Sequence, residues 1–352
     1  MIFGVSLNLL ISFYITFYLL FDMKSIFDKC EFGDLTLNSR IIRTGLWESK
    51  QNDLDAIYSR YDKIASSGVG LITSELYSIY PKDKFIEHSF RLDSRNFMTM
   101  AGKVSEICHS YDVPILGQVE FIKYNRGIDL DIPVNDLTTE DIRKIQADII
   151  QAAQKLQLAG FDGIQLSIGN NFFLSKFINP YYNQRTDEYG GNILNRMRLV
   201  LELVKVMKDN LDLHISVKVN TFDERKDGFN STESLESCKL LDKVGVDSIQ
   251  VTRPLSPLYF TKKLSGEKEL LDYSNKLIKS INAPVIVGGG FNEMNHMNEI
   301  LNNSDIEYMS MYRPFVCEND FLKNWKTGDC AESRCLMCNN CYRTKKSNCY
   351  HF

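Results

Sequence analysis

The sequence predicts an α/β protein built as a single TIM barrel of eight β/α units, followed by a short Cys-rich tail. From Arg40 onward, short β-branched runs alternate with longer segments of helical period, which is typical of parallel strands joined by helices. Eight such runs can be counted. No second compositional block or low-complexity linker interrupts them, so a closed barrel is favoured over an open sheet.

The predicted strands are short runs of apolar, mostly branched residues. In chain order they cover residues 41–44, 69–74, 113–119, 163–166, 213–219, 248–252, 285–288 and 308–311. The segments between them have helical spacing. One clear example follows the candidate N-cap Thr138 and has one apolar face formed by Ile142, Ile145, Ile149, Ala152 and Leu156. Such faces predict helices that cover the outside of the barrel.

The chain divides into three predicted parts: a hydrophobic segment at 1–22, the barrel at 23–328 and the tail at 329–352. Residues 2–21 carry no charge and are long enough to cross a membrane as a helix, but they lack the features of a cleaved signal peptide. Two interpretations stay open, a membrane anchor through residues 2–21 or an upstream extension of a reading frame that starts at Met23. We therefore expect a cytoplasmic protein, with membrane anchoring as the alternative.

Charge and cysteine content narrow the class of partner. The formal net charge of −4 gives no basic face for a nucleic-acid backbone, so nucleic acid is not expected as a partner. Nine cysteines are unevenly spread, five of them in the last stretch. The four scattered cysteines are interpreted as small buried side chains in a reducing compartment. A small-molecule substrate is expected, and a homo-oligomer is left open.

The ends of the seventh and eighth predicted strands indicate an anion site. Gly288, Gly289 and Gly290 expose backbone N–H groups ahead of a helix expected to begin near Asn292, and Arg313 follows the eighth strand. The last two loops of a TIM barrel often bind phosphate. The alternative is that the glycines serve only a tight turn and Arg313 a surface ion pair.

The most specific motif lies at residues 179–198. Its defining positions are Pro180, Asn183, Arg185, Asp187, Tyr189-Gly190-Gly191, Asn195-Arg196 and Arg198. This pattern resembles the signature of the Old Yellow Enzyme group of NADH:flavin oxidoreductases, and the resemblance extends over about residues 27–325. We interpret the motif as a loop held by Arg and Asp pairs, with a structural rather than a catalytic role.

The resemblance implies FMN across the mouth of the barrel and NADH or NADPH as co-substrate. It places Thr44 and Gly45 near the reactive side of the flavin ring, Gln118 at the pyrimidine edge and Lys218 near N1 and O2. Gly289, Gly290 and Arg313 would hold the phosphate. A cation at Lys218 is also expected on chemical grounds, because reduced flavin carries negative charge near N1 that an ammonium stabilises. The alternatives are a lysine paired with a carboxylate and a glutamine that is merely polar.

At the substrate side the sequence departs from the group. A His pair or His-Asn pair with a nearby tyrosine is usual, whereas this chain has Ser167, Asn170 and Phe172. Ser167 and Asn170 are the predicted catalytic residues, although serine has less reach than imidazole and Phe172 cannot deliver a proton. The replacement donors considered are Tyr77, Tyr124, Tyr181 and Tyr182, each of which could also be an ordinary loop aromatic.

The tail carries four closely spaced thiols. Cys335, Cys338 and Cys341 are three residues apart, and Cys349 follows eight residues later. Such a set can hold an iron–sulfur cluster or zinc, and larger members of the group carry a cluster with longer gaps. Free thiols are the alternative.

These features predict an FMN-dependent NAD(P)H oxidoreductase that passes hydride through flavin N5 to an electron-poor small molecule, in the manner of an ene-reductase. A flavin-binding or electron-transfer barrel that has lost ene-reductase chemistry is the alternative. A third interpretation is a flavin-free barrel acting on a phosphorylated metabolite. The physiological acceptor and the choice between NADH and NADPH are not predicted.

Overall fold

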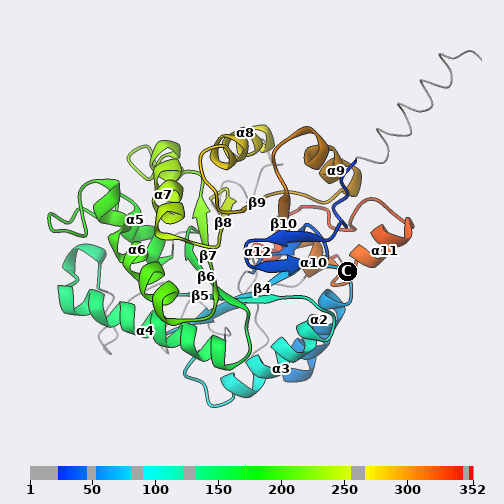
Figure 1. The fold of residues 1–352 in the computed structure, drawn as a ribbon, viewed down its shortest axis with the longest axis horizontal. Helices are drawn as coiled ribbons and strands as arrows, with labels where there is room; N and C mark the ends of the chain where they lie inside the picture. The colour runs from blue at the N-terminus through cyan, green and yellow to red at the C-terminus, as the bar shows by residue number, and fades with distance from the viewer. Residues whose placement is uncertain are drawn as a thin grey trace, which may run out of the picture.

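Eight parallel strands close into a barrel in the computed structural model, which describes residues 23–45, 53–80, 90–121, 132–170, 172–254, 266–343 and 349–351 (Figure 1). The strand order is β10-β3-β4-β5-β6-β7-β8-β9. The strands are β3 (Ile41–Arg43), β4 (Leu71–Ser78), β5 (Ile115–Glu120), β6 (Gly163–Ile168), β7 (His214–Asn220), β8 (Ser248–Thr252), β9 (Val285–Gly288) and β10 (Tyr308–Met311). The predicted TIM barrel is confirmed, and each predicted run overlaps one strand.

The main difference from the predicted strands lies in β4. This strand continues to Ser78, beyond the predicted end at Ser74, and its pairing with β5 shifts between Thr73 and Leu76. An irregularity of this kind accommodates extra residues in one strand and re-aims the side chains beyond it. Side-chain alternation alone could not have indicated the continuation.

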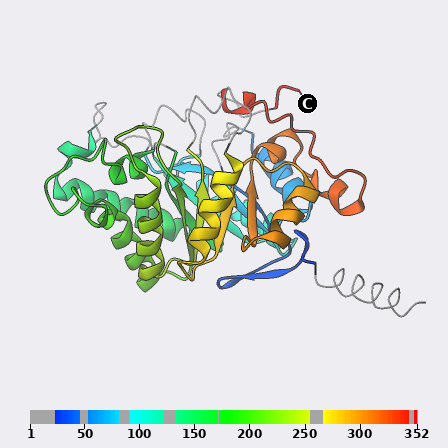
Figure 2. The ribbon, with the colours of Figure 1, turned by 90° about the horizontal axis from the view of Figure 1, so that it is seen from above.

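Helices surround the barrel in the expected places (Figures 1 and 2). They are α2 (Leu54–Ala65), α3 (Phe97–His109), α4 (Thr139–Leu158), α5 (Phe173–Ile178), α6 (Ile193–Asn210), α7 (Ser231–Val244), α8 (Glu267–Ile278), α9 (Met294–Asn303), α10 (Arg313–Cys317), α11 (Leu322–Thr327) and α12 (Asn340–Arg343). The predicted N-cap of α4 is confirmed, because Thr138 and Asp141 form a reciprocal capping box. No helix in the described part of the chain is long and apolar enough to span a membrane, and residues 1–22 lie outside it.

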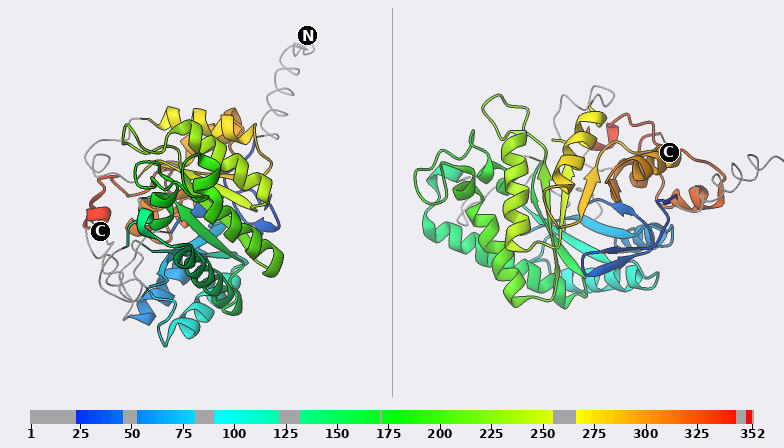
Figure 3. Two further views of the ribbon diagram at one scale, coloured as in Figure 1. Left: turned by 90° about the vertical axis from the view of Figure 1, so that its left-hand side faces the viewer. Right: turned by 45° about the horizontal axis from the view of Figure 1, so that its top comes forward.

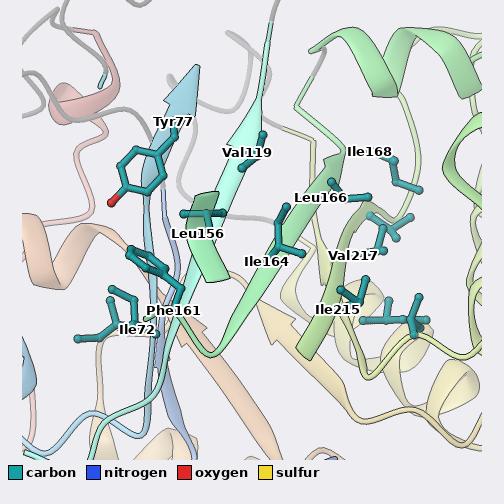
Figure 4. Close-up of a cluster of buried hydrophobic side chains, with 14 of the residues drawn as sticks. Ile72, Tyr77, Val119, Leu156, Phe161, Ile164, Leu166, Ile168, Ile215 and Val217 are labelled. Atoms are coloured by element: carbon teal, nitrogen blue, oxygen red, sulfur yellow. The ribbon is translucent and has the colours of Figure 1, made fainter. Parts of the chain in front are cut away.

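The outer core lies between strands and helices. Alternate residues of β6 and β7 point outward, where Ile164, Leu166 and Val217 are completely buried (Figure 4). They belong to the same apolar cluster as Leu156 of α4 and Phe161. The inward positions of these strands are polar instead, which brings polar side chains into the barrel interior.

A two-stranded hairpin that was not predicted covers one end of the barrel. It consists of β1 (Cys30–Phe32) and β2 (Leu35–Leu37), which pair antiparallel. Phe32 and Leu37 form one apolar cluster with Ile42, Leu71, Leu116 and Ile286 from the barrel strands. Figures 2 and 3 show this hairpin in dark blue and the C-terminal segment in red at opposite ends of the barrel. The carboxyl ends of the strands therefore lie on the side of the tail.

Candidate active site

A cavity at the carboxyl ends of the strands collects most of the predicted site residues. Its wall contains Thr44, Gly45, Asn170, Lys218, Gly289, Gly290 and Arg313. These residues come from five loops or strand ends that are far apart in sequence. Gln118 and Ser167 are fully buried and are not part of the cavity wall. Further wall residues come from the end of β8 and from the tail.

Lys218 projects into the barrel mouth from β7. Its Nζ donates a long hydrogen bond of 3.4 Å to Oγ1 of Thr44, which also accepts a 2.9 Å hydrogen bond from Nε2 of Gln250. Burial lowers the pKa of Lys218 to about 8, and the carboxylate of Glu120 opposes this shift. The site therefore holds a poorly solvated ammonium, which gains from a negative charge placed beside it.

Gln118 lies directly beside the backbone of Gly45. A Cβ atom on Gly45 would be 1.7 Å from the carbonyl oxygen of Ser74 and 2.7 Å from Oε1 of Gln118. Only glycine therefore fits at this position. The structure thus brings the predicted site residues Gly45 and Gln118 together, although Gln118 is not part of the cavity wall.

Three buried side chains at this end of the barrel have polar atoms without a hydrogen-bond partner among the described residues. The unpartnered atoms are the amide nitrogen and oxygen of Gln118, the hydroxyl of Ser167, and the amide nitrogen and oxygen of Asn170. Asn170 also has a left-handed backbone, with φ of 64°. Unsatisfied buried polar atoms are costly and call for an explanation, such as a ligand. Amides that donate and accept, next to a buried ammonium, fit the edge of a flavin ring.

The glycine loop after β9 and Arg313 form the other end of the cavity. Gly290 has a φ of 66°, and Arg313 is 8% exposed. Helix α9 begins at Met294, later than the expected start near Asn292, and the N–H of Met294 donates to Ala331 of the tail. The tail therefore already uses the first N–H of this helix.

Comparison with known proteins gives the family of this fold and site. The model for the NADH:flavin oxidoreductase / NADH oxidase family matches residues 25–331. The chain belongs to this family. The resemblance to the Old Yellow Enzyme group is thereby confirmed.

The relatives differ in length and in the reactions for which they are named. The chain is 26% identical to an "NADH oxidase" from Thermoanaerobacter brockii, covering 90% of this chain and 53% of that protein. It is 22% identical to a "4,4'-dithiodibutanoate disulfide reductase" from Rhodococcus erythropolis, covering 91% and 93%. The chain spans about half the length of the first of these relatives and of a 26% identical "Metal reductase" from Desulforamulus reducens.

Solved structures support the same fold. The Old Yellow Enzyme homologue from Zymomonas mobilis superposes with a TM-score of 0.70 at 19% identity, covering 89% of this chain and 95% of that one. A 2-naphthoyl-CoA reductase complex superposes with a TM-score of 0.76 at 18% identity, covering 88% and 54%. At these identities the likeness concerns the fold.

The motif at residues 179–198 that indicated the family forms a loop held by hydrogen bonds and an Arg–Asp ion pair, as predicted. Arg185 donates to both carboxylate oxygens of Asp187 and to the carbonyl oxygens of Val134 and Leu137. These hydrogen bonds hold the pKa of Asp187 below its ordinary value. Asn183 donates to the carbonyl of Tyr189 at 2.8 Å, which closes the loop on itself. None of these residues lines the cavity.

Sequence reasoning missed Gln250 as an organising residue of the site. Its Nε2 donates to Thr44 and, at 3.0 Å, to Oγ of Ser310, while its Oε1 accepts from Nε2 of Gln165 at 3.0 Å. The alternation of polar and apolar residues at 248–252 indicated which face is polar. In a closed barrel with helices outside, the polar face must point inward.

The tyrosines considered as proton donors lie elsewhere. Tyr77 is fully buried and packs edge-on against Phe97 at 5.2 Å, and burial raises its pKa well above the ordinary value (Figure 4). Tyr181 and Tyr182 lie under the guanidinium of Arg225, at 4.4 and 5.4 Å. None of these three lines the cavity, and Tyr124 lies outside the described residues.

Four tail thiols and Cys317 of α10 surround a second, small cavity beside Arg313. Its wall includes Cys317, Cys335, Cys338, Cys341 and Cys349. Burial raises the pKa of Cys341 to about 11. Nevertheless, within the ranges that the structure describes, no three His, Cys, Asp or Glu side chains are arranged to hold a metal ion. A metal bound by the four predicted cysteines stays a prediction.

Proposed function

We propose that the protein is an FMN-dependent NAD(P)H oxidoreductase that passes hydride to an electron-poor small molecule. The observation that carries this proposal is the buried ammonium of Lys218, hydrogen-bonded to Thr44 at 3.4 Å in a cavity whose surroundings contain unsatisfied amides. When bound, FMN accepts hydride from NADH or NADPH at N5 and delivers it to the acceptor. Membership of the family supports this chemistry.

The described residues divide into two functional groups. Lys218 would stabilise negative charge at the pyrimidine side of the ring, and Thr44 and Gln250 hold it in place. Gln118 would hydrogen-bond the pyrimidine edge, and Gly45 permits the close approach. At the other end, the backbone of Gly289 and Gly290 together with Arg313 would bind the phosphate.

The residues on the substrate side favour quinones or oxygen over enones as acceptors. Asn170 lines the cavity with an unsatisfied amide, which can donate a hydrogen bond to an acceptor oxygen. Ser167 is completely buried. We assign Asn170 and Ser167 to acceptor binding, with quinones or oxygen as favoured acceptors. The alternative, an electron-transfer barrel without ene-reductase chemistry, rests on the same weak substrate clamp.

We place this activity in the cytoplasm, because the scattered cysteines suggested a reducing compartment, and reserve membrane anchoring for the case in which residues 2–21 form an anchor. Of these cysteines, Cys108 and Cys238 are buried as expected, whereas Cys30 and Cys317 are only partly buried. A homo-oligomer is compatible with the proposal. Hydride transfer through the flavin does not need an iron–sulfur cluster or zinc in the tail.

The test starts from the full-length protein purified without oxygen. Its absorbance spectrum should show bound flavin, and chromatography of the released flavin should identify FMN. Addition of NADH or NADPH should bleach the flavin bands. Lys218→Met should slow this bleaching at least about tenfold, whereas Lys205→Met, at an exposed lysine of α6, should not. A colourless protein that binds no FMN on reconstitution would overturn the proposal.

A further inference from the structure

The tail is attached to the glycine loop of the proposed phosphate site. The backbone N–H of Ser333 donates to the carbonyl of Asn292 at 2.8 Å, and the N–H of Met294 donates to Ala331 at 2.7 Å. Glu293 and Glu332 form an antiparallel bridge between the same two segments. This backbone pairing holds the tail against the segment that follows the glycine loop after β9.

Beyond this attachment, the tail enters the wall of the cavity itself. Met337 and Asn339 both line it, and both have left-handed backbones, with φ of 53° and 63°. Asn339 is only 7% exposed, and Nη1 of Arg313 donates to its Oδ1 at 2.6 Å. Arg313 and Asn339 also line the thiol cavity, so this pair stands between the two cavities.

The chemistry of the pair suits an anion site. A guanidinium is a planar group whose N–H donors have fixed directions, so one well-placed acceptor orients the whole group. An amide oxygen does this without cancelling the positive charge, whereas a carboxylate would neutralise it. Asn339 can therefore orient Arg313 toward a phosphate dianion without itself neutralising the guanidinium.

We propose that Asn339 is a positioning residue for Arg313, through which the C-terminal tail sets the affinity of the site for the phosphate of FMN. The inference rests on the proposed FMN site but assigns a new role to a residue outside the barrel. It predicts a loss that depends on the phosphate. Riboflavin, which has the same ring and lacks the phosphate, is therefore the informative comparison.

The experiment measures dissociation constants of FMN and riboflavin for the full-length apoprotein by quenching of flavin fluorescence. Asn339→Ala should weaken FMN binding roughly tenfold and leave riboflavin binding unchanged. Asn339→Asp should weaken FMN binding further, because its carboxylate would pair with Arg313. The matched control is Asn340→Ala, since Asn340 lines the thiol cavity but not the flavin cavity.

A double variant links the effect to Arg313. Once Arg313→Ala has removed the guanidinium, Asn339→Ala should cause no further loss of FMN affinity. Riboflavin binding shows that the pocket of each variant is folded. Equal losses for FMN and riboflavin would mean that Asn339 only supports the wall, which overturns the inference, as would unchanged FMN affinity in Asn339→Ala.

The same measurements distinguish failure of the Asn339 inference from failure of the proposed flavin site. If Arg313→Ala weakens FMN binding and Asn339→Ala does not, the phosphate site stands and only the role of Asn339 is wrong. If the unmodified protein binds neither FMN nor riboflavin, the flavin site and the inference both fall.

Discussion

The ammonium of Lys218 on β7 donates a hydrogen bond to the hydroxyl of Thr44, which directly follows β3. The two residues are 174 positions apart in the sequence. Gln250 donates to the same hydroxyl at 2.9 Å. The position of Lys218 is thus set by Thr44, which follows β3, and indirectly by Gln250 on β8. This arrangement leads to a prediction about pH.

The free energy of unfolding of the apoprotein should rise with pH in a window set by Lys218. Burial lowers the pKa of Lys218 from 10.5 to about 8, so the unfolded chain binds more protons than the folded chain between these values. The corresponding stabilisation is absent below about pH 8 and complete above pH 10.5. It amounts to roughly 3 kcal/mol at 1.36 kcal/mol per pKa unit.

Urea unfolding across this window measures the effect. Lys218→Met should remove the increment, while Lys205→Met, at an exposed position, should retain it. Parallel pH profiles for the unmodified protein and Lys218→Met would contradict the assignment of a buried, desolvated ammonium.

Gly45→Ala should destabilise the barrel mouth. The added Cβ would lie 1.7 Å from a backbone oxygen of Ser74, which cannot move without disturbing β4. We expect a loss of at least about 1–3 kcal/mol of unfolding free energy, the usual range for overpacking. Gly102→Ala is the control, because a Cβ at this position of α3 meets nothing within 4 Å. That change should instead stabilise the protein by about 0.5–1 kcal/mol. Similar effects of the two substitutions in urea unfolding would disprove the close approach.

The hairpin at the opposite end should respond to acid through Asp34. Its Oδ1 lies 2.6 Å from Nδ1 of the buried His214, and this hydrogen bond lowers the pKa of Asp34 below 3.8. The contribution is therefore present above pH 3.8 and lost as the pH falls through the folded pKa. Asp34 is largely exposed, so solvent screening limits the effect to about 1 kcal/mol or less.

Asp34→Asn should lower the free energy of unfolding at neutral pH, and the difference from the unmodified protein should shrink in acid. Glu31→Gln is the matched control, since Glu31 lies on the same hairpin and its carboxylate accepts a local hydrogen bond from Thr36, while its backbone carbonyl accepts from Tyr308 in either variant. Urea unfolding at neutral pH and below pH 3.8 distinguishes the two. A pH-independent loss in Asp34→Asn would rule out the titration of this carboxylate as its cause.

Reduction of simple cyclic enones should be slow, while NAD(P)H oxidation with quinones or oxygen should be measurable. Enone reduction needs stabilisation of developing charge on oxygen and a proton donor, and the hydroxyl of Ser167 and the ring of Phe172 are poor substitutes. Loss of one such donor costs about 2.7–4 kcal/mol in other enzymes. Ser167→His combined with Phe172→Tyr should recover part of the enone rate relative to the quinone rate. Fast enone turnover by the unmodified protein would show that another residue supplies the proton.

Local patterns were sufficient to predict the barrel. The predicted strand runs 248–252 and 285–288 coincide with β8 and β9, because a buried strand is encoded by a short run of consecutive apolar and branched residues. The glycine loop and Arg313 could be assigned to one site for a similar reason. The carboxyl ends of neighbouring parallel strands always lie at the same end of a barrel. The sequence by itself therefore determined the fold, the end of the barrel that carries the site and several residues of the cavity wall.

Only the tertiary structure decided how these residues are held. Thr44 meets Lys218 and Gln250 across 174 and 206 residues, and Arg313 meets Asn339 from a tail for which the sequence indicated only a metal site or free thiols. The hairpin that packs against His214 was equally hidden. A hydrogen bond between distant residues depends on closure of the barrel and on the direction of each side chain. Neither leaves a periodic pattern in the chain, which is why the partners of Lys218 and Arg313 became visible only in the folded molecule.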